Sequence, residues 1–277
     1  MRKEIALVVT LFFASLVYAG EDIPKRIISL GPSLTESLYF LEEEERLVGV
    51  TSYCLRPPEA QEKEKVGSVI KVSLEKILSL EPDLIVTTSL TDPKVIEKLT
   101  SLGIKTVTFP EPKNFDELCE QFIKLAELVG KKDKAKKIIH DTEERISFIT
   151  EKVKALEKPK IFIQVGAKPL FAASKDSFMN DFIRFAGGIN IAGEALEGLY
   201  SREEVLRKNP DIIIIVTMGI AGKNEKKIWE RYTVLNAVKN NRVYIVDSYK
   251  VCSPTPLAFV ETLDEIAEIL HPETKGE

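Results

Sequence analysis

The sequence predicts an α/β protein made of two Rossmann-like lobes, each with a parallel sheet, joined by one long rigid α-helix. Apolar runs of strand length alternate with amphipathic runs of helix length, which is the pattern of parallel sheets with crossover helices. One short motif occurs once in each half of the chain, and a stretch without Gly or Pro lies between the halves. These observations predict two similar domains separated by a helical rod.

The composition is that of a folded protein. The 277 residues are 44% hydrophobic and 30% charged, so the chain has enough apolar side chains to bury a core. The net charge of −4 leaves no basic surplus to neutralise phosphates, and nucleic acid is therefore not expected as a partner. We expect the protein to act as a monomer.

The first 19 residues resemble a secretory signal peptide. Arg2 and Lys3 precede the apolar run 5–17, and Val17-Tyr18-Ala19 fits a small-x-small cleavage site. No Cys follows the cleavage point, so no lipid-anchor cysteine is expected, and the mature protein is predicted to be periplasmic. The alternative is a buried N-terminal helix.

The N-terminal lobe is expected over residues 20–130. Its apolar runs predict strands at 26–30, 47–51, 83–88 and 105–109. A helix is expected over 34–43, where Ser33 and Glu36 have the spacing of a capping box, and another over 93–101, closed by Gly103.

A bridging helix is expected over residues 131–158. No Gly or Pro occurs from 131 to 156, and apolar residues recur there at spacings of three and four, which keeps them on one helical face. At ~1.5 Å per residue this stretch would reach about 39 Å, the width of a small domain. An ordinary crossover helix is the alternative, but it does not explain the length.

The C-terminal lobe is expected over residues 159–277. Strands are predicted at 160–165, 212–217 and 242–247. A helix over 178–186 should end at Gly187-Gly188, and a closing helix over 257–270 should pack its apolar stripe onto a lobe.

The internal repeat is SLEKILSLEPDLIV from Ser73 and SREEVLRKNPDIII from Ser201. Each copy reads as a Ser N-cap, a short helix, a Pro-Asp turn and a buried strand. Glu75 and Glu203 therefore occupy equivalent places at two helix starts. Each would stabilise its helix by about 0.3–1 kcal/mol through the helix dipole, or the two would form a matched acidic pair for a partner that straddles both lobes.

Catalytic motifs are missing from the sequence. His140 and His271 are its two histidines, too few for a triad or a multi-histidine metal site, and no phosphate-binding glycine loop, G-x-S-x-G or H-E-x-x-H is present. No catalytic residue and no metal site is predicted, and the chain is not expected to be an enzyme. An exported two-lobe enzyme that uses the cleft remains the alternative.

A ligand site is expected in the cleft between the lobes, because ligands of doubly wound sheets bind beyond the carboxyl ends of the strands. The loops there offer aromatic rings and a few polar donors, which suits a bulky ligand held by stacking and shape. The candidate ligand-binding residues are Pro32, Ser33, Tyr53, Arg56, Val69, Thr88, Phe171, Tyr200 and Tyr249.

Three cysteines are too few for a disulfide framework. Cys119 lies in a helical run and reads as a small buried hydrophobe. Cys54 and Cys252 lie in loops of the two halves, where they form a disulfide, contact the ligand, or remain independent thiols.

Several blocks of the chain resemble one known family. RIISLGPSLTESLYFLEEEERLVGVTSYCLRPPEAQ, VSLEKILSLEPDLIV, FIQVGAKPLFAASKDSFMNDFIRFAGGINIA and YSREEVLRKNPDIIII are similar in order and spacing to the substrate-binding proteins of ABC importers for cobalamin and ferric siderophores. The resemblance implies a ligand between two lobes that close little on binding. It also implies that Glu75 and Glu203 dock onto arginines of the permease in the inner membrane.

The resemblance implies a small-molecule metal chelate as ligand and no resident cofactor. Tyr53 and Phe171 stand where cobalamin binders contact the corrin, but Val69, Thr88 and Glu197 replace their tryptophans and Tyr249 replaces another aromatic. A cobalamin-type or truncated corrinoid, a ferric siderophore or haem would fit, and Arg56 or Lys250 would meet an anionic ligand. Zinc and manganese binders of this architecture need histidines that the chain lacks.

Overall fold

The N-terminal half forms a parallel five-stranded sheet. A computed structural model describes residues 23–216 and 220–274, so the expected signal peptide at 1–19 lies outside the described residues. The strand order is β3-β2-β1-β4-β5, and every pairing is parallel. The strands are β1 (Ile27–Ser29), β2 (Leu47–Val50), β3 (Glu64–Lys65), β4 (Leu84–Thr88) and β5 (Lys105–Phe109).

The C-terminal half forms a second sheet, in the order β10-β9-β6-β7, with β8 paired to the start of β6. The β6·β9, β9·β10 and β6·β8 pairs are parallel, whereas β7 is antiparallel to β6. The chain beyond the predicted strand 160–165 thus forms a tight antiparallel hairpin. The strands are β6 (Lys160–Ala167), β7 (Leu170–Ala172), β8 (Ile189–Asn190), β9 (Ile212–Ile215) and β10 (Val243–Ile245).

Helices cover both faces of the N-terminal sheet. On β4, Leu84 and Val86 pack against α1 (Pro32–Phe40) and α4 (Phe115–Leu128), while Ile85 packs against α2 (Leu74–Ser79) and α3 (Pro93–Ser101). Neighbouring side chains of a strand point to opposite faces, so a strand covered on both sides is apolar throughout. This is why 83–88 could be predicted as a buried strand. Short 3₁₀ helices lie at Glu44–Arg46 and Pro58–Glu62.

The C-terminal sheet is covered in the same way. Ile212 and Ile214 of β9 face α6 (Met179–Phe185) and α11 (Pro256–Leu270), whereas Ile213 and Ile215 face the other layer. That layer contains α7 (Arg202–Lys208), α8 (Ile220–Trp229) and α9 (Asn236–Lys239). The remaining helices are α10 (Ser248–Cys252) and two 3₁₀ turns, Leu196–Gly198 and Pro272–Thr274.

The capping box predicted at Ser33 and Glu36 is wrong. Helix α1 begins at Pro32 with Gly31 as its N-cap, and no side chain caps it. Proline is favoured in the first turn of a helix because its missing N–H has no intrahelical partner there. Ser33 therefore lies within the first turn, and Glu36 is buried one turn further on.

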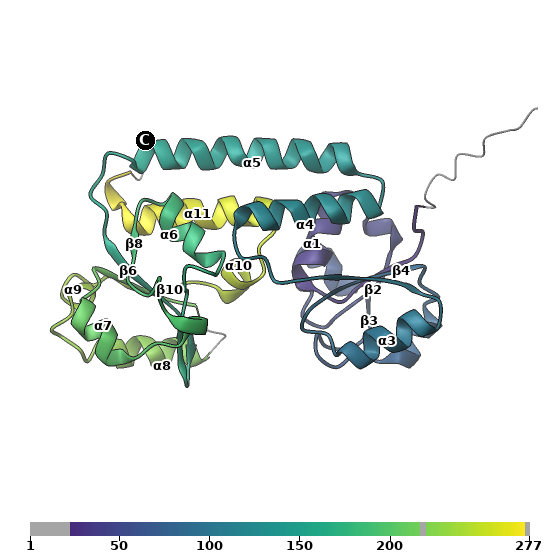
Figure 1. The fold of residues 1–277 in the computed structure, drawn as a ribbon, viewed down its shortest axis with the longest axis horizontal. Helices are drawn as coiled ribbons and strands as arrows, with labels where there is room; N and C mark the ends of the chain where they lie inside the picture. The colour runs from purple at the N-terminus through teal and green to yellow at the C-terminus, as the bar shows by residue number, and fades with distance from the viewer. Residues whose placement is uncertain (1–22, 217–219, 275–277) are drawn as a thin grey trace, which may run out of the picture.

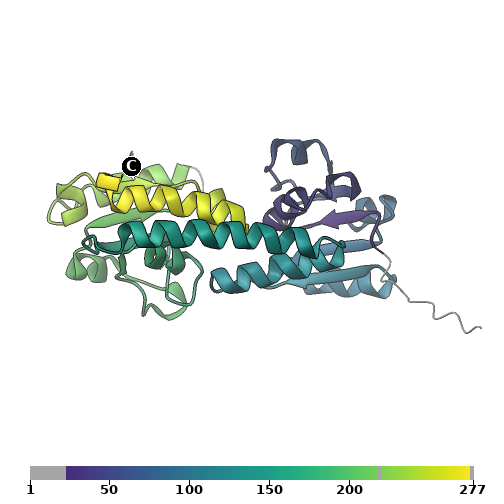
Figure 2. The same cartoon turned by 90° about the horizontal axis from the view of Figure 1, so that it is seen from above.

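Helix α5 (Lys132–Val153) is the predicted bridge, with 22 residues. It runs along both lobes and lies against α4 and α11, as Figures 1 and 2 show from two directions. Its buried residues Ala135, Ile146 and Ile149 pack against the N-terminal core at one end and the C-terminal core at the other. Nothing among the described helices is long and apolar enough to cross a membrane.

The two lobes share a hydrophobic core beneath α5. The start of α4 brings Phe115, Leu118 and Cys119 into the same cluster as Phe182 of α6 and Phe259 of α11. The rings of Phe115 and Phe259 are 4.8 Å apart, and the Phe115 N–H donates a hydrogen bond to the carboxylate of Asp181 at 2.8 Å. The expected boundary at residue 130 separates the two sheets but not the helical layer, which packs against both lobes.

A buried polar network lies on the far face of the C-terminal sheet. Glu225 of α8 is 4% exposed, and its Oε2 accepts a hydrogen bond from the Gln164 amide of β6 at 2.8 Å. The Arg202 guanidinium also pairs with this carboxylate and lies 4.5 Å from the centre of the Trp229 ring. The Trp229 indole N–H donates to Gln164 Oε1 at 2.6 Å, so one network joins α7, α8 and β6.

Gly188 is needed for close packing at the end of α6. A Cβ on Gly188 would collide with Ile161 Cδ1 and would lie 3.0 Å from Leu270 Cδ2, inside the core. Gly188→Ala is therefore expected to reduce the free energy of unfolding by about 1–3 kcal/mol, the usual effect of overpacking. Urea denaturation measures the loss. Gly193→Ala is the control, because its Cβ would meet nothing nearer than Asn190 O at 3.6 Å, and an equal loss in both variants would contradict the packing argument.

Candidate ligand-binding site

A pocket of about 380 Å³ opens between the two halves of the molecule, and we call it the interlobe pocket. Its volume lies within the range of small-molecule sites. The N-terminal lobe and α4 provide most of the lining, and the segment after α10 closes one side. The lining residues are Pro32, Ser33, Leu34, Tyr53, Ser68, Val69, Ile70, Thr88, Leu90, Phe109, Pro110, Glu111, Pro112, Leu118, Gln121, Cys252, Ser253 and Pro254.

The pocket lies at the carboxyl ends of the N-terminal strands. Thr88 is the last residue of β4 and Phe109 the last of β5, while Pro32 and Ser33 begin α1 directly after the β1 turn. Gly31 allows this turn to approach β4, because a Cβ there would lie 2.7 Å from Thr88 Cγ2. This is the edge at which doubly wound sheets bind ligands.

The pocket wall is mainly apolar and has few polar groups. Val, Leu, Ile, Phe and Pro side chains dominate it, and none of its described lining residues is Lys, Arg or His. The Thr88 Oγ1 atom is buried and has no hydrogen-bond partner within the described residues. Among the described lining residues, Glu111 alone carries a carboxylate, and desolvation raises the pKa of its carboxyl. Such a wall suits an uncharged or cationic ligand with a broad apolar face.

Five of the predicted ligand residues line this pocket: Pro32, Ser33, Tyr53, Val69 and Thr88. Tyr53 is 53% exposed, so its ring is available for stacking. The prediction missed the turn 109–112 and the α4 residues Leu118 and Gln121. The turn had a signal, because it follows a predicted strand, whereas the approach of α4 depends on tertiary packing.

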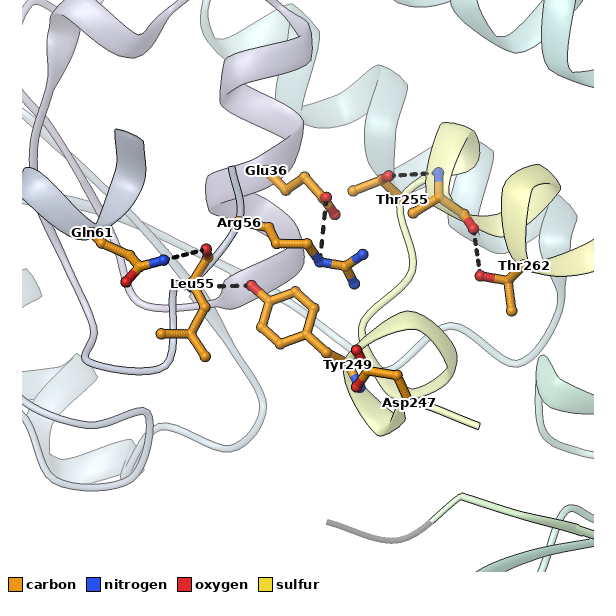
Figure 3. A network of polar contacts seen from close by, with 9 residues as sticks. Glu36, Leu55, Arg56, Gln61, Asp247, Tyr249, Thr255 and Thr262 are labelled. Atoms are coloured by element: carbon orange, nitrogen blue, oxygen red, sulfur yellow. Dashed lines mark hydrogen bonds and ion pairs between the residues drawn. The ribbon is translucent and has the colours of Figure 1, made fainter. Parts of the chain in front are cut away.

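Arg56 and Tyr249 hold the lobes together beside the pocket and are absent from its lining. Figure 3 shows Tyr249 of α10 reaching the N-terminal loop that contains Leu55 and Arg56. The Leu55 N–H donates to the Tyr249 hydroxyl at 3.3 Å, and the Arg56 guanidinium carbon lies 4.2 Å from the centre of the Tyr249 ring. Burial raises the pKa of the Tyr249 hydroxyl.

Arg56 also faces Glu36 of α1, with 3.8 Å between Arg56 Nε and Glu36 Oε1. Burial raises the pKa of the Glu36 carboxyl, and the positive charge of Arg56 opposes that shift. Lys250, the second residue expected to meet an anionic ligand, forms an ion pair with Glu265 at 2.9 Å. Arg56 thus contacts Glu36 and the Tyr249 ring, although its Nε and Nη2 atoms form no hydrogen bond within the described residues, whereas Lys250 is paired with Glu265. Neither cation lines the interlobe pocket.

Phe171 and Tyr200 lie elsewhere in the C-terminal lobe. Phe171 lines a separate hollow at the end of β6, together with Gly166, Asp176 and Glu197. The Tyr200 ring packs 5.6 Å from the Phe162 ring, and its hydroxyl donates to the Ile191 carbonyl at 3.0 Å. Tyr200 therefore supports the C-terminal core and lines neither pocket.

Glu75 and Glu203 occupy matching places in the two lobes. Each is exposed in the first turn of a helix whose N-cap Ser accepts a backbone hydrogen bond, at 3.3 Å for Ser73 and 3.1 Å for Ser201. The two helices, α2 and α7, cover the sheet faces turned away from α5. In Figure 1, α7 lies on the opposite side of its sheet from α5.

Cys54, Cys119 and Cys252 are free thiols. Cys54 is buried against the hydroxyls of Thr35 and Thr51, so it does not pair with Cys252. Burial raises the pKa of Cys119 to about 12, and desolvation raises that of Cys252 to about 11. Across residues 23–216 and 220–274, no three His, Cys, Asp or Glu side chains form a group able to hold a metal ion.

The fold and the pocket define a two-lobed α/β protein with a small-molecule-sized pocket between its halves. The sequence model of one family matches residues 27–250. The chain belongs to this family, the periplasmic binding proteins.

Similar proteins and a solved structure show more closely which kind of periplasmic binding protein this chain is. The ABC transporter substrate-binding lipoprotein YvrC of Bacillus subtilis is 32% identical over 259 residues, which cover 91% of this chain and 81% of the relative. The vitamin B12-binding protein of Vibrio cholerae is 29% identical over 263 residues, covering 94% and 92%. A solved structure of a possible iron-binding, periplasmic solute-binding protein from Staphylococcus epidermidis has a TM-score of 0.80 at 28% identity, covering 90% and 99%. The chain is a substrate-binding protein of an ABC importer.

Proposed function

We propose that this protein captures a corrinoid of the vitamin B12 type in the interlobe pocket and delivers it, chemically unchanged, to the importer's permease. The observation that carries the proposal is an apolar pocket between two lobes with no cationic side chain in its lining. A corrin presents a broad apolar face with amides at its rim, which suits this wall. The vitamin B12-binding relatives support the same ligand class.

Anionic chelates fit the pocket less well. Haem carries two propionates and many ferric siderophores carry a net negative charge, and their burial requires cationic partners. Arg56 and Lys250 do not line the pocket, and they face Glu36, Tyr249 and Glu265 instead. A ferric siderophore or haem is therefore the less favoured cargo.

We propose that Glu75 and Glu203 contact the permease when the ligand is delivered. Both carboxylates are exposed, both stand at the start of equivalent helices, and both helices lie on the side away from α5. Such a pair offers one acidic contact per lobe to a partner that spans the molecule. We place this exchange in the periplasm, after removal of the signal peptide expected at residues 1–19.

The ligand class is tested by titrating the purified mature protein with cyanocobalamin, cobinamide, haem and a ferric tricatecholate siderophore. Saturable one-to-one binding of the corrinoids is expected, with at least about tenfold weaker binding of the two anionic chelates, because the pocket offers them no cationic partner. Equilibrium dialysis with the absorption spectrum is the suitable readout. Trp229 is fully buried in the C-terminal core and does not line the pocket, so its fluorescence would report poorly.

The pocket itself is tested in the same titration. Tyr53→Ala is expected to weaken corrinoid binding about tenfold, because it removes an exposed aromatic face. Tyr232→Ala is the matched control, since Tyr232 packs against Trp229 outside the pocket. Preferential binding of haem or the tricatecholate, or turnover of a bound corrinoid, would reject the proposed cargo or its unaltered delivery.

A further inference from the structure

Glu111 occupies an unusual position in the interlobe pocket. It lies in the turn Pro110-Glu111-Pro112 directly after β5, between two prolines that restrict the backbone. It lines the pocket, and no other described lining residue carries a carboxylate. The charge that a ligand meets in this pocket is therefore set by one residue.

Within residues 23–216 and 220–274 the Glu111 carboxylate forms no ion pair and no hydrogen bond, unlike Glu36, which faces Arg56. The surrounding protein removes water from it and raises the pKa of its carboxyl. A partly desolvated carboxylate gains most from a ligand that supplies N–H donors or positive charge, because charge-assisted hydrogen bonds are the strong ones.

The hollow of the C-terminal lobe that contains Phe171 is also lined by acidic side chains without basic ones among the described residues. It lies at the end of β6 and contains Asp176 and Glu197, with no Lys, Arg or His among its lining residues. Each lobe thus presents carboxylates without cations at the carboxyl end of its strands. The interlobe pocket and this hollow share no residue, so the acidic lining of the hollow is an observation independent of Glu111.

Resting on the proposed function, we propose that Glu111 is the specificity-determining residue for ligand charge. Its carboxylate accepts hydrogen bonds from the amide N–H groups at the rim of a corrinoid or pairs with a positive charge on it. The same carboxylate repels corrinoids whose rim carries carboxylates. The pocket therefore selects amidated, neutral or cationic corrinoids and rejects acidic ones.

The experiment compares two corrinoids with the same ring. Cobinamide carries amides at its rim, whereas cobyrinic acid carries carboxylates at the same positions. Their dissociation constants are measured by equilibrium dialysis for the wild-type protein, Glu111→Gln and Glu111→Lys. Glu97→Gln is the matched control, because Glu97 is an exposed carboxylate on α3 outside the pocket.

The wild-type protein is expected to prefer cobinamide strongly. Glu111→Gln should reduce that preference about tenfold, mainly through tighter binding of cobyrinic acid, and Glu111→Lys should reduce it further. Glu97→Gln should leave it unchanged. Circular dichroism confirms that each variant is folded before its affinities are compared.

The possible failures can be told apart. If the wild-type protein binds neither corrinoid, the proposed function fails. If it binds cobinamide but Glu111→Gln and Glu97→Gln keep the same preference as the wild type, the corrinoid role stands and the role of Glu111 is overturned. Equal binding of both corrinoids by the wild-type protein overturns the role of Glu111 as well.

Discussion

Replacing Glu75 and Glu203 together with lysine is expected to abolish uptake while leaving ligand affinity unchanged. Both side chains are exposed, and neither lines the interlobe pocket. Each reversal turns a proposed attraction to a permease arginine into a repulsion, and like-charge contacts across an interface cost several kcal/mol. Uptake of labelled cobalamin into cells that depend on this protein measures transport, and equilibrium dialysis measures ligand binding.

A control variant with two other charge reversals distinguishes a loss of docking from an effect of the changed net charge. Glu143→Lys with Glu157→Lys changes the charge by the same amount at exposed positions on α5 and in the segment after it, outside α2 and α7. This control should transport normally. Normal uptake by the Glu75/Glu203 double variant, or equal loss in the control, would remove the proposed docking role.

The second large effect is expected at the buried network of the C-terminal lobe. Glu225→Leu would leave the Arg202 guanidinium and the Gln164 amide without their shared acceptor. Breaking a buried ion pair usually destabilises a protein by about 3–5 kcal/mol. The Arg202 side chain is 23% exposed, so solvent screens part of this effect, and we expect a loss of about 2–4 kcal/mol in the free energy of unfolding.

Urea denaturation followed by circular dichroism measures that loss. The tryptophan fluorescence of the folded state should also change, because Trp229 is the single tryptophan and donates to Gln164 within the network. Lys227→Ala, an exposed change on the same helix, should lie within about 0.5 kcal/mol of wild type. Adding Arg202→Leu to Glu225→Leu should cost less than the sum of the single variants. Additive losses would show that the pair does not act as a unit.

Much of the fold could be predicted because its strands are covered on both faces. Such strands are continuous apolar runs, and the predicted bounds of β4 differ from the observed ones by one residue. The edge strand β5 and helix α3 also match the predicted residues. The short strands β3, β7 and β8 have only two or three residues and exist through pairing with longer neighbours. Helix α10 was expected as a loop for a similar reason, because five residues carry too little periodicity to recognise.

The ligand site was less predictable than the fold, because an aromatic or charged residue in a loop can contact either a ligand or the neighbouring lobe. Tyr53 lines the pocket, whereas Tyr249 and Arg56 contact each other across the lobes and Tyr200 enters a core. Sequence spacing does not distinguish these outcomes, since each depends on which surface the loop meets. Glu111 was overlooked because it is a single acid between prolines, and its importance comes from the apolar wall around it.

The core shared by α4, α6 and α11 has a consequence for how the importer recognises a loaded carrier. We expect lobes joined by this common packing to keep nearly the same outline whether the pocket is full or empty. The proposed permease would then meet almost identical surfaces on both forms, and the empty carrier would compete with the loaded one for the same docking surface. Occupancy would be read from local changes at the pocket mouth, and an excess of unloaded protein is expected to slow import.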